Sequence, residues 1–539
     1  MTHINDLPVI VLGQILYQAA ATPAKNLSEW KAKLLLLAVC RTWTTLAIGT
    51  VFSQVYIEPL RSPDSISSAH FLWTSNAELL ISRECVSMAR RLTLEWSYCA
   101  TSDHLHYIVV EILKLDRVDW QDINSLTITL ADWTIYRTQY QHLHNDRVTT
   151  DNADIVQYFA QNLRNVVELN LHYRRYGATE KYLFDGLATH YDQQFQVLRA
   201  PGQIPMPISC IARNINVLEL TLDLSAACIL PSICGGTLRV LRLDNVPRNF
   251  AWHYFRYDIF VRPVVFRQLA ILRLTFKYED TQLTEGEIQD KIDSGAHCCE
   301  QLGFPALKEL SISNCTPDCD LLYANLPFPG LDRVNFSGDV SDIRHCSRLK
   351  LTWVRELHVA IISADLGDTT DFYRVTNHFF SDICIGQTAA LHIFCDWFML
   401  DPELMRWVNL TTLQFHSVNY SKVCRAIGRL PNLCELIIRY LEFGNKASDS
   451  SAVDSSLFFN ADPMVSWGAK LATVEINALD RKYPVSVCVD SIQAFILHAG
   501  ALKALTVPES AEELVDAFIE IHTDRYSHLA DIDLISSDF

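Results

Sequence analysis

The residues best suited to chemistry in this sequence are histidine, cysteine and carboxylate side chains. The nearest approach to a metal-ligand pattern is His297-Cys298-Cys299, followed by Cys315 and Cys319. Zinc prefers thiolate and imidazole ligands, but three consecutive residues fit poorly around one tetrahedral ion. We therefore expect neither a metal centre nor a cofactor.

Other polar clusters also lack the spacing of a catalytic site. His104-x-His106 is predicted to lie in a polar loop, and the adjacent Glu512 and Glu513 fit the first turn of a helix, where the helix dipole favours acidic groups. The sequence contains no phosphate-binding loop, nucleophile elbow, zinc-protease helix or dinucleotide fingerprint. The sequence thus predicts a binding protein rather than an enzyme. Its function then depends on the elements that form a binding surface.

Composition excludes several partners of such a surface. The chain has 539 residues, of which 49% are hydrophobic and 20% charged, so it is long enough for several domains or one repeat array and too apolar for bulk disorder. Its 45 Lys and Arg stand against 62 Asp and Glu, giving a net charge of −17. This charge disfavours nucleic acids and anionic membranes as partners. No apolar run is long enough to span a membrane.

Cysteine usage and the start of the chain favour an intracellular protein. Sixteen cysteines are scattered along the sequence. Cys395, Cys434 and Cys488 lie in apolar, strand-like segments and are predicted to be small buried side chains. Asp6 interrupts the N-terminal segment, and no basic region precedes its apolar residues, so no signal peptide is expected. We expect a cytoplasmic or nuclear location, or both.

One six-residue pattern recurs from about residue 90 onward: apolar-x-x-apolar-x-apolar. The alternation of its last two apolar positions with a polar residue indicates a short strand with one buried face. The hexads begin at Val166, Leu238, Leu269, Leu307, Leu331, Val354, Leu410, Leu433, Leu471, Leu502 and Leu529, with weaker relatives near Arg91, Ser125, Ile215 and Ala390.

This pattern resembles the leucine-rich repeat. The fourth hexad positions Leu310, Val334 and Leu357 are 24 and 23 residues apart, which is one strand-plus-return per repeat. The resemblance implies an α/β fold, an irregular solenoid with parallel strands on its concave face and helices outside. A doubly wound α/β sheet is the alternative, but its strands would be apolar on both faces. The family's ninth repeat position is usually Asn or Cys, and here only Cys315 matches it.

Helix-like segments separate the strands, as a strand–turn–helix repeat requires. They begin at Thr179, Tyr420, Cys488 and Ser510. A repeat array leaves an apolar end that must be covered. We therefore predict that Ile532 and Leu534 of the last strand are buried.

The N-terminal segment predicts three short, strongly apolar helices. Pro8 suits a first helical position, because the N–H that it lacks has no partner there. A second helix is predicted over 27–38, and a third begins near Val39-Cys40 and contains Trp43. Helices so short and apolar bury little by themselves, so their excess surface requires a partner.

This segment resembles an F-box over residues 4–57. The resemblance implies docking on the Skp-type adaptor of a cullin-RING ubiquitin ligase. The adaptor-binding positions that it implies are Leu7, Pro8, Ile15, Leu16, Val39, Cys40 and Trp43. The alternative is that these helices only cap the first repeat. The expected domains are an F-box-like helical module at 1–57, a helical linker or capping segment at 58–89, and the solenoid at 90–539.

An F-box joined to leucine-rich-type repeats implies a substrate-recognition subunit of an SCF-type ligase, in which the repeats bind a protein substrate and the adaptor links the chain to a cullin. The alternative is a repeat scaffold without a ligase role. Polar positions between the last two apolar residues of the hexads would form the substrate-binding face: Asn170, Arg242, Arg273, Ser311, Asn335, His358, His392 and Gln414.

Overall fold

The structure is a computed structural model that forms two compact units. The first unit comprises 1–243 with 253–264, and the second comprises 244–252 with 265–539. Besides a few single residues, the structure describes 9–21, 27–59, 73–97, 107–131, 160–172, 194–201, 214–221, 236–246, 266–276, 304–314, 330–338, 354–361, 389–394, 408–419, 430–442, 470–479 and 499–537.

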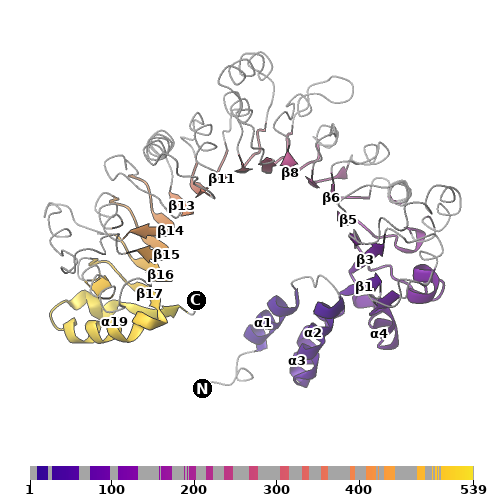
Figure 1. Ribbon diagram of the computed structural model, residues 1–539, viewed down its shortest axis with the longest axis horizontal. Coiled ribbons are helices and arrows are strands. Elements are labelled where there is room, and N and C mark those ends of the chain that lie inside the picture. Colours follow the sequence, from indigo (N-terminus) through magenta and orange to yellow (C-terminus); the bar gives the residue numbers. More distant parts are fainter. Residues whose placement is uncertain are drawn as a thin grey trace, which may run out of the picture. The chain divides into compact units, whose positions relative to one another are not determined.

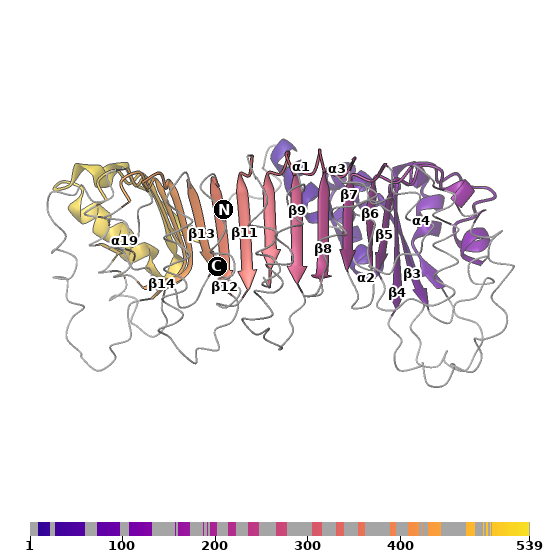
Figure 2. The ribbon, with the colours of Figure 1, turned by 90° about the horizontal axis from the view of Figure 1, so that it is seen from above.

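The first unit combines N-terminal helices with a row of short strands (Figures 1 and 2). The helical elements are α1 Val9–Ala21, α2 Leu27–Ala38, α3 Arg41–Val51, α4 Ala77–Ser82, η3 Val86–Met88 and η4 Ile108–Ile112. The strands are β1 Gln54–Pro59, β2 Trp73–Ser75, β3 Arg91–Ser97, β4 Ser125–Ala131, β5 Glu168–His172, β6 Val197–Pro201, β7 Val217–Thr221 and β8 Val240–Val246, whose last three residues belong to the second unit. β1 pairs with β3, and β3 to β7 pair successively, all in parallel.

The outer edge of β1 is covered partly by a strand and partly by a side chain. β2 pairs antiparallel with residues 57–59 of β1. Over the first half of β1, the buried side chain of Asn76 takes the place of a strand: its Nδ2 donates to the Gln54 carbonyl (2.9 Å) and its Oδ1 accepts from the Tyr56 N–H (2.7 Å). The row of parallel strands therefore begins at Gln54, ahead of the expected start near residue 90, and its first edge is satisfied.

The second unit is a row of ten parallel strands within its described residues. They are β9 Ile271–Phe276, β10 Glu309–Ser313, β11 Arg333–Gly338, β12 Glu356–Ile361, β13 Ala390–Phe394, β14 Thr412–Asn419, β15 Glu435–Glu442, β16 Thr473–Ile476, β17 Ala504–Pro508 and β18 Asp533–Ser537. Each strand pairs with the next one along the chain, as the hexads predict. Both units thus have the strand arrangement of leucine-rich repeats.

The hexad register places equivalent apolar residues side by side. Leu310 pairs with Leu272 on one side and Val334 on the other, and all three are fully buried. The first hexad residues, such as Leu307, are buried as well, at the turn into each strand. Because side chains alternate along a strand, one face of the row is a continuous apolar core and the other is available to solvent.

Backbone hydrogen bonds fix the start of each repeat. The carbonyl of Ala270 accepts from two successive N–H groups of the next repeat, those of Lys308 (2.9 Å) and Glu309 (3.0 Å). The Lys308 carbonyl accepts from Asp332 and Arg333 in the same way, both at 2.9 Å. This repeated double contact holds adjacent strands in one register, although the connections between them differ in length.

The segments expected to be helical are described only in part. Single residues within them, Leu187, Val423, Ile492 and Ile496, are helical and buried. The remainder of those segments lies outside the described residues, so the placement of helices outside a concave strand face stays a prediction. The last predicted helix is confirmed as α19 Glu509–His522, which is followed by η8 Ser527–Asp531.

Two predictions of burial are wrong. Ile532 and Leu534 are only partly buried, because β18 pairs with β17 alone among the described residues; Leu529 carries the burial at this end. Cys434 is exposed. It lies between the buried Leu433 and Leu436, at the turn into β15, where it falls outside the apolar register. Cys395 and Cys488 lie outside the described residues.

The three N-terminal helices pack on one another, α1 and α2 both contacting α3, and α2 also contacts β1. Trp30 of α2 is the anchor: its indole N–H donates to the Val51 carbonyl (2.8 Å), and its ring lies 6.2 Å from that of Phe52. The Leu27 N–H donates to the Glu58 carboxylate (3.2 Å). Among the described residues, no helix is long and apolar enough to cross a membrane.

Candidate functional site

The polar strand face is the row of side chains that alternate with the buried apolar positions. The predicted substrate-binding residues of the second unit occupy one register column of it: Arg273, Ser311, Asn335, His358, His392 and Gln414. Asn170 and Arg242 hold the same hexad position in the first unit. Exposure varies along the column: Arg273 is exposed, whereas Gln414 is almost covered by its neighbours.

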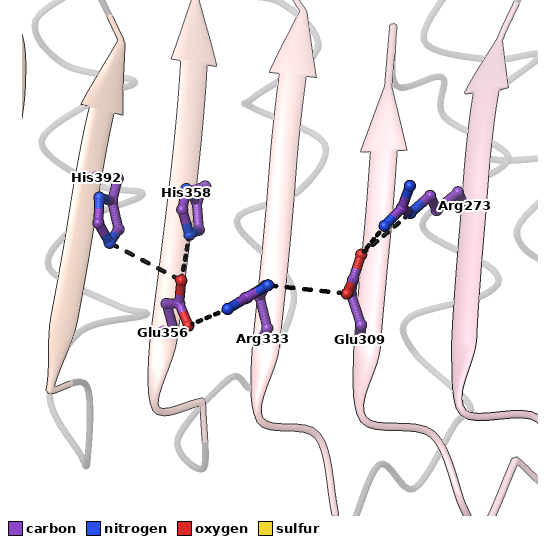
Figure 3. A network of polar contacts seen from close by, with 6 residues as sticks. All are labelled: Arg273, Glu309, Arg333, Glu356, His358 and His392. Atoms are coloured by element: carbon purple, nitrogen blue, oxygen red, sulfur yellow. Dashed lines mark hydrogen bonds and ion pairs between the residues drawn. The ribbon is translucent and has the colours of Figure 1, made fainter. Parts of the chain in front are cut away.

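Charged residues of alternating sign form a second column, two residues earlier on the same strands. Glu309 accepts from Arg273 (2.8 Å), and its other oxygen lies 4.0 Å from Arg333. Arg333 also donates to Oε2 of Glu356 at 2.8 Å. Figure 3 shows these side chains as a continuous chain of contacts across neighbouring strands. The chain consists of two cations and two anions, so it adds no net charge to the face.

Two histidines end this chain of contacts. Nε2 of His358 lies 2.6 Å from Oε1 of Glu356, and Nε2 of His392 lies 3.9 Å from the same oxygen (Figure 3). Nδ1 of His392 lies 2.6 Å from Oε1 of Gln414. The amide oxygen of Gln414 is an acceptor, so Nδ1 of His392 donates in this contact.

The contacts and burial of this group set its charge states. Burial lowers the pKa of His358, the hydrogen bond to Glu356 opposes that change, and the neighbouring His392 adds to it. Burial alone would raise the pKa of Glu356, but hydrogen bonds from His358 and Arg333 hold this pKa below its ordinary value. The hydrogen bond to Glu356 raises the pKa of Arg333. At neutral pH the group therefore contains a Glu356 carboxylate, an Arg333 guanidinium and a neutral His358 imidazole.

The first unit carries a smaller cluster on the same face. Arg199 of β6 forms ion pairs with Glu168 of β5 and, at 3.1 Å, with Glu219 of β7. It also donates to Oδ1 of Asn170 (2.9 Å), whose amide nitrogen lies 3.2 Å from the Thr127 hydroxyl. Asn170 is thus held within a polar network on its own strand row.

The charged column and one turn residue, Asn314, were not predicted from the sequence. The signal for the column is the residue before each fourth hexad position, Glu309, Arg333 and Glu356, where charge alternates at the repeat spacing. Asn314 follows β10 with a positive φ of 54°, and its Nδ2 donates to the Phe276 carbonyl (3.1 Å). Asn314 thus links adjacent repeats. It directly precedes Cys315, which holds the position that is usually Asn or Cys in leucine-rich repeats. Cys315 and the residues at 297–299 and 319 lie outside the described residues.

The N-terminal helices leave apolar side chains exposed. Val39 is 53% exposed, Cys40 is also exposed, and Trp43 is partly covered. Ile15 is exposed, whereas Leu16 is buried within the helices. Leu7 and Pro8 lie outside the described residues.

The largest apolar exposures on these helices are residues that the F-box resemblance does not single out. Ile10 of α1 is 77% exposed and Leu35 of α2 is 69% exposed. Both values are high for large aliphatic side chains in a folded unit. The three helices therefore present more apolar surface than the implied adaptor positions alone.

Comparisons with known proteins show no family for this chain. No family model and no curated protein matches the sequence. Among solved structures, the leucine-rich-repeat protein LIC12759 of Leptospira interrogans matches with 12% identity and a TM-score of 0.26, over 84% of this chain and 90% of that one. A superposition this loose carries no argument, so the repeat assignment rests on the strand pairing within each unit.

Proposed function

We propose that this chain is a non-catalytic binding protein that holds a protein ligand on its polar strand face and is the substrate-recognition subunit of a cullin-RING ubiquitin ligase. Adaptor docking is assigned to the N-terminal helices, and substrate binding to the repeats. The observation that carries the docking assignment is the exposure of Val39 and Cys40, with Trp43 partly accessible, at positions that the F-box pattern uses.

The polar strand face supports the binding assignment. Its side chains project from adjacent strands held in one register, so they form a preorganised surface on a rigid framework. Ion pairs and hydrogen bonds fix many of these side chains before any ligand arrives, which reduces the entropy lost on binding. A repeat scaffold without a ligase role would use the same face, so adaptor binding separates the two functions.

The test is calorimetric titration of the full chain with a purified Skp-type adaptor. Val39→Asp and Trp43→Ala each remove a contact of the proposed interface, and loss of the aromatic anchor is expected to weaken binding by about 2 kcal/mol, roughly 30-fold. Ile521→Asp, at a 74% exposed position of α19, is the matched control and should bind as the unmodified chain does.

Each outcome of the titration distinguishes the ligase role from the scaffold role or tests the proposed interface residues. Absence of any heat with the unmodified chain removes the ligase role and leaves the scaffold. Binding that survives both N-terminal substitutions keeps the adaptor but removes these residues from the interface. Capture of ligands from cells, followed by mass spectrometry, then compares the unmodified chain with Arg273→Glu, a charge reversal on the polar strand face.

A further inference from the structure

The cluster formed by Glu356, His358 and His392 has the composition of a metal site. One oxygen of Glu356 and one nitrogen of each histidine all lie within 4.8 Å of one another. Two imidazoles and a carboxylate are a ligand set found in zinc sites that keep an open coordination position. We propose that these three residues form a binding site for a divalent first-row transition metal ion, with Zn²⁺ as the probe.

The backbone brings the three ligands together without any loop. Glu356 and His358 lie two residues apart on β12 and so share a face, and His392 of β13 is the registered neighbour of His358. Their side chains are 15–28% exposed, so an ion can reach them from solvent. The remaining coordination position would point to the solvent in front of the polar strand face.

Modest side-chain movement converts the present contacts into coordination. Ligand atoms of a tetrahedral zinc ion lie about 3.4 Å apart. The Glu356–His358 contact of 2.6 Å must open, and the Glu356–His392 contact of 3.9 Å must close, each by less than about 1 Å. The rings are now nearly parallel, so they must also turn about their Cβ–Cγ bonds, a soft torsion. On binding, the Nε2 proton of His358 moves to Nδ1 of the same ring, which stays neutral.

Hydrogen bonds with surrounding residues orient the ligands, as they do in metal proteins. Arg333 donates to Oε2 of Glu356, which leaves Oε1 directed at the imidazoles. Gln414 accepts the Nδ1 proton of His392, which leaves Nε2 as the coordinating atom. Imidazole ligands favour zinc, copper and nickel over the oxygen-seeking Mg²⁺ and Ca²⁺.

The experiment titrates the full chain, stripped of metal by a chelator, with Zn²⁺ in a calorimeter. His392→Ala and Glu356→Gln are expected to bind one Zn²⁺ per chain fewer than the unmodified protein. Gln414→Ala, which keeps all three ligands, is expected to weaken that site about 10- to 100-fold. His416→Ala, which removes an exposed histidine from the adjacent strand β14, is the matched control and should keep the site. Mg²⁺ at the same concentrations should give no binding at this site.

Cobalt(II) provides a second readout, because its visible bands depend on the ligands that coordinate it. The unmodified chain should show the visible bands of a nitrogen- and oxygen-ligated Co²⁺, and His392→Ala should lose them. Circular dichroism of the metal-free variants checks that each is folded. Equal zinc stoichiometry in the unmodified chain and a folded ligand variant overturns the proposal. Absence of Zn²⁺ binding by the unmodified chain also overturns the proposal, whatever the variants do.

Discussion

The indole N–H of Trp30 in α2 donates a 2.8 Å hydrogen bond to the carbonyl oxygen of Val51, the last residue of α3. Trp30 is 2% exposed, so this bond forms away from water. It ties the helix that carries the exposed Leu35 to the turn that leads into β1. The apolar surface of the N-terminal helices is therefore presented by a fixed element.

Trp30→Phe keeps a ring in this position but leaves the Val51 carbonyl without its donor. We expect a loss of about 1–3 kcal/mol of local stability, because an unsatisfied buried carbonyl carries its full desolvation cost. Hydrogen–deuterium exchange of α3 peptides should accelerate accordingly. Leu35→Ala, which changes an exposed side chain, should leave exchange nearly unchanged; equal acceleration in both variants would contradict the anchoring role.

Leu310→Ala removes a fully buried side chain from the register column that runs across β9, β10 and β11. We expect a destabilisation of about 2–5 kcal/mol, since the site loses apolar burial and gains a cavity. Denaturant unfolding monitored by circular dichroism measures it. Ser311→Ala is the control on the other face of the same strand and should shift the transition by much less.

Arg199 influences the protonation of His172 on the neighbouring strand β5. The His172 side chain reaches solvent, yet partial burial lowers its pKa, and the positive charge of Arg199 lowers this pKa further. Arg199→Gln should therefore raise the pKa of His172. Proton NMR titration of the imidazole, assigned with His172→Gln, measures the change; an unchanged or lower pKa would refute the coupling.

The same shift has a consequence for stability. A folded-state pKa below the unfolded value means that the unfolded chain binds more protons. The contribution of His172 is therefore fully present above the ordinary histidine pKa of about 6.5 and is lost as pH falls below this value through the folded-state pKa. Melting curves between pH 7.5 and pH 5 should show a smaller acid-induced loss for His172→Gln than for the unmodified chain.

The C-terminal closure can be tested by truncation. Removing residues 526–539 deletes β18 and the buried Leu529, and it uncovers the edge of β17, where Val507 is fully buried. We expect lower solubility and a lower melting temperature, because an uncovered strand edge and apolar end favour association. Size-exclusion chromatography should show larger species, whereas removal of 538–539 alone should not; an equally soluble, equally stable 1–525 chain would rule out this role.

The repeat pattern made the strand rows predictable, because local alternation such as Leu310–Ser311–Ile312 determines which side chains are buried. The Glu356–His358–His392 cluster was not predictable in the same way. His358 and His392 were identified separately as face residues, but their contact depends on the pairing of β12 with β13. Asn76 was missed for a related reason: a polar side chain that replaces a strand has no periodic signature.

The Asn76 side chain also makes the edge of β1 different from the edge of β18. With β2 it satisfies the backbone groups along the free side of β1, so no further strand can add there. At the opposite terminus of the chain, β18 pairs only with β17 among the described residues, and Ile535 on it is 45% exposed. Of these two described edges, that of β18 is the one at which an extended peptide would pair by strand addition, which makes the C-terminal strand a place to attach or block such a peptide in engineered versions of the chain.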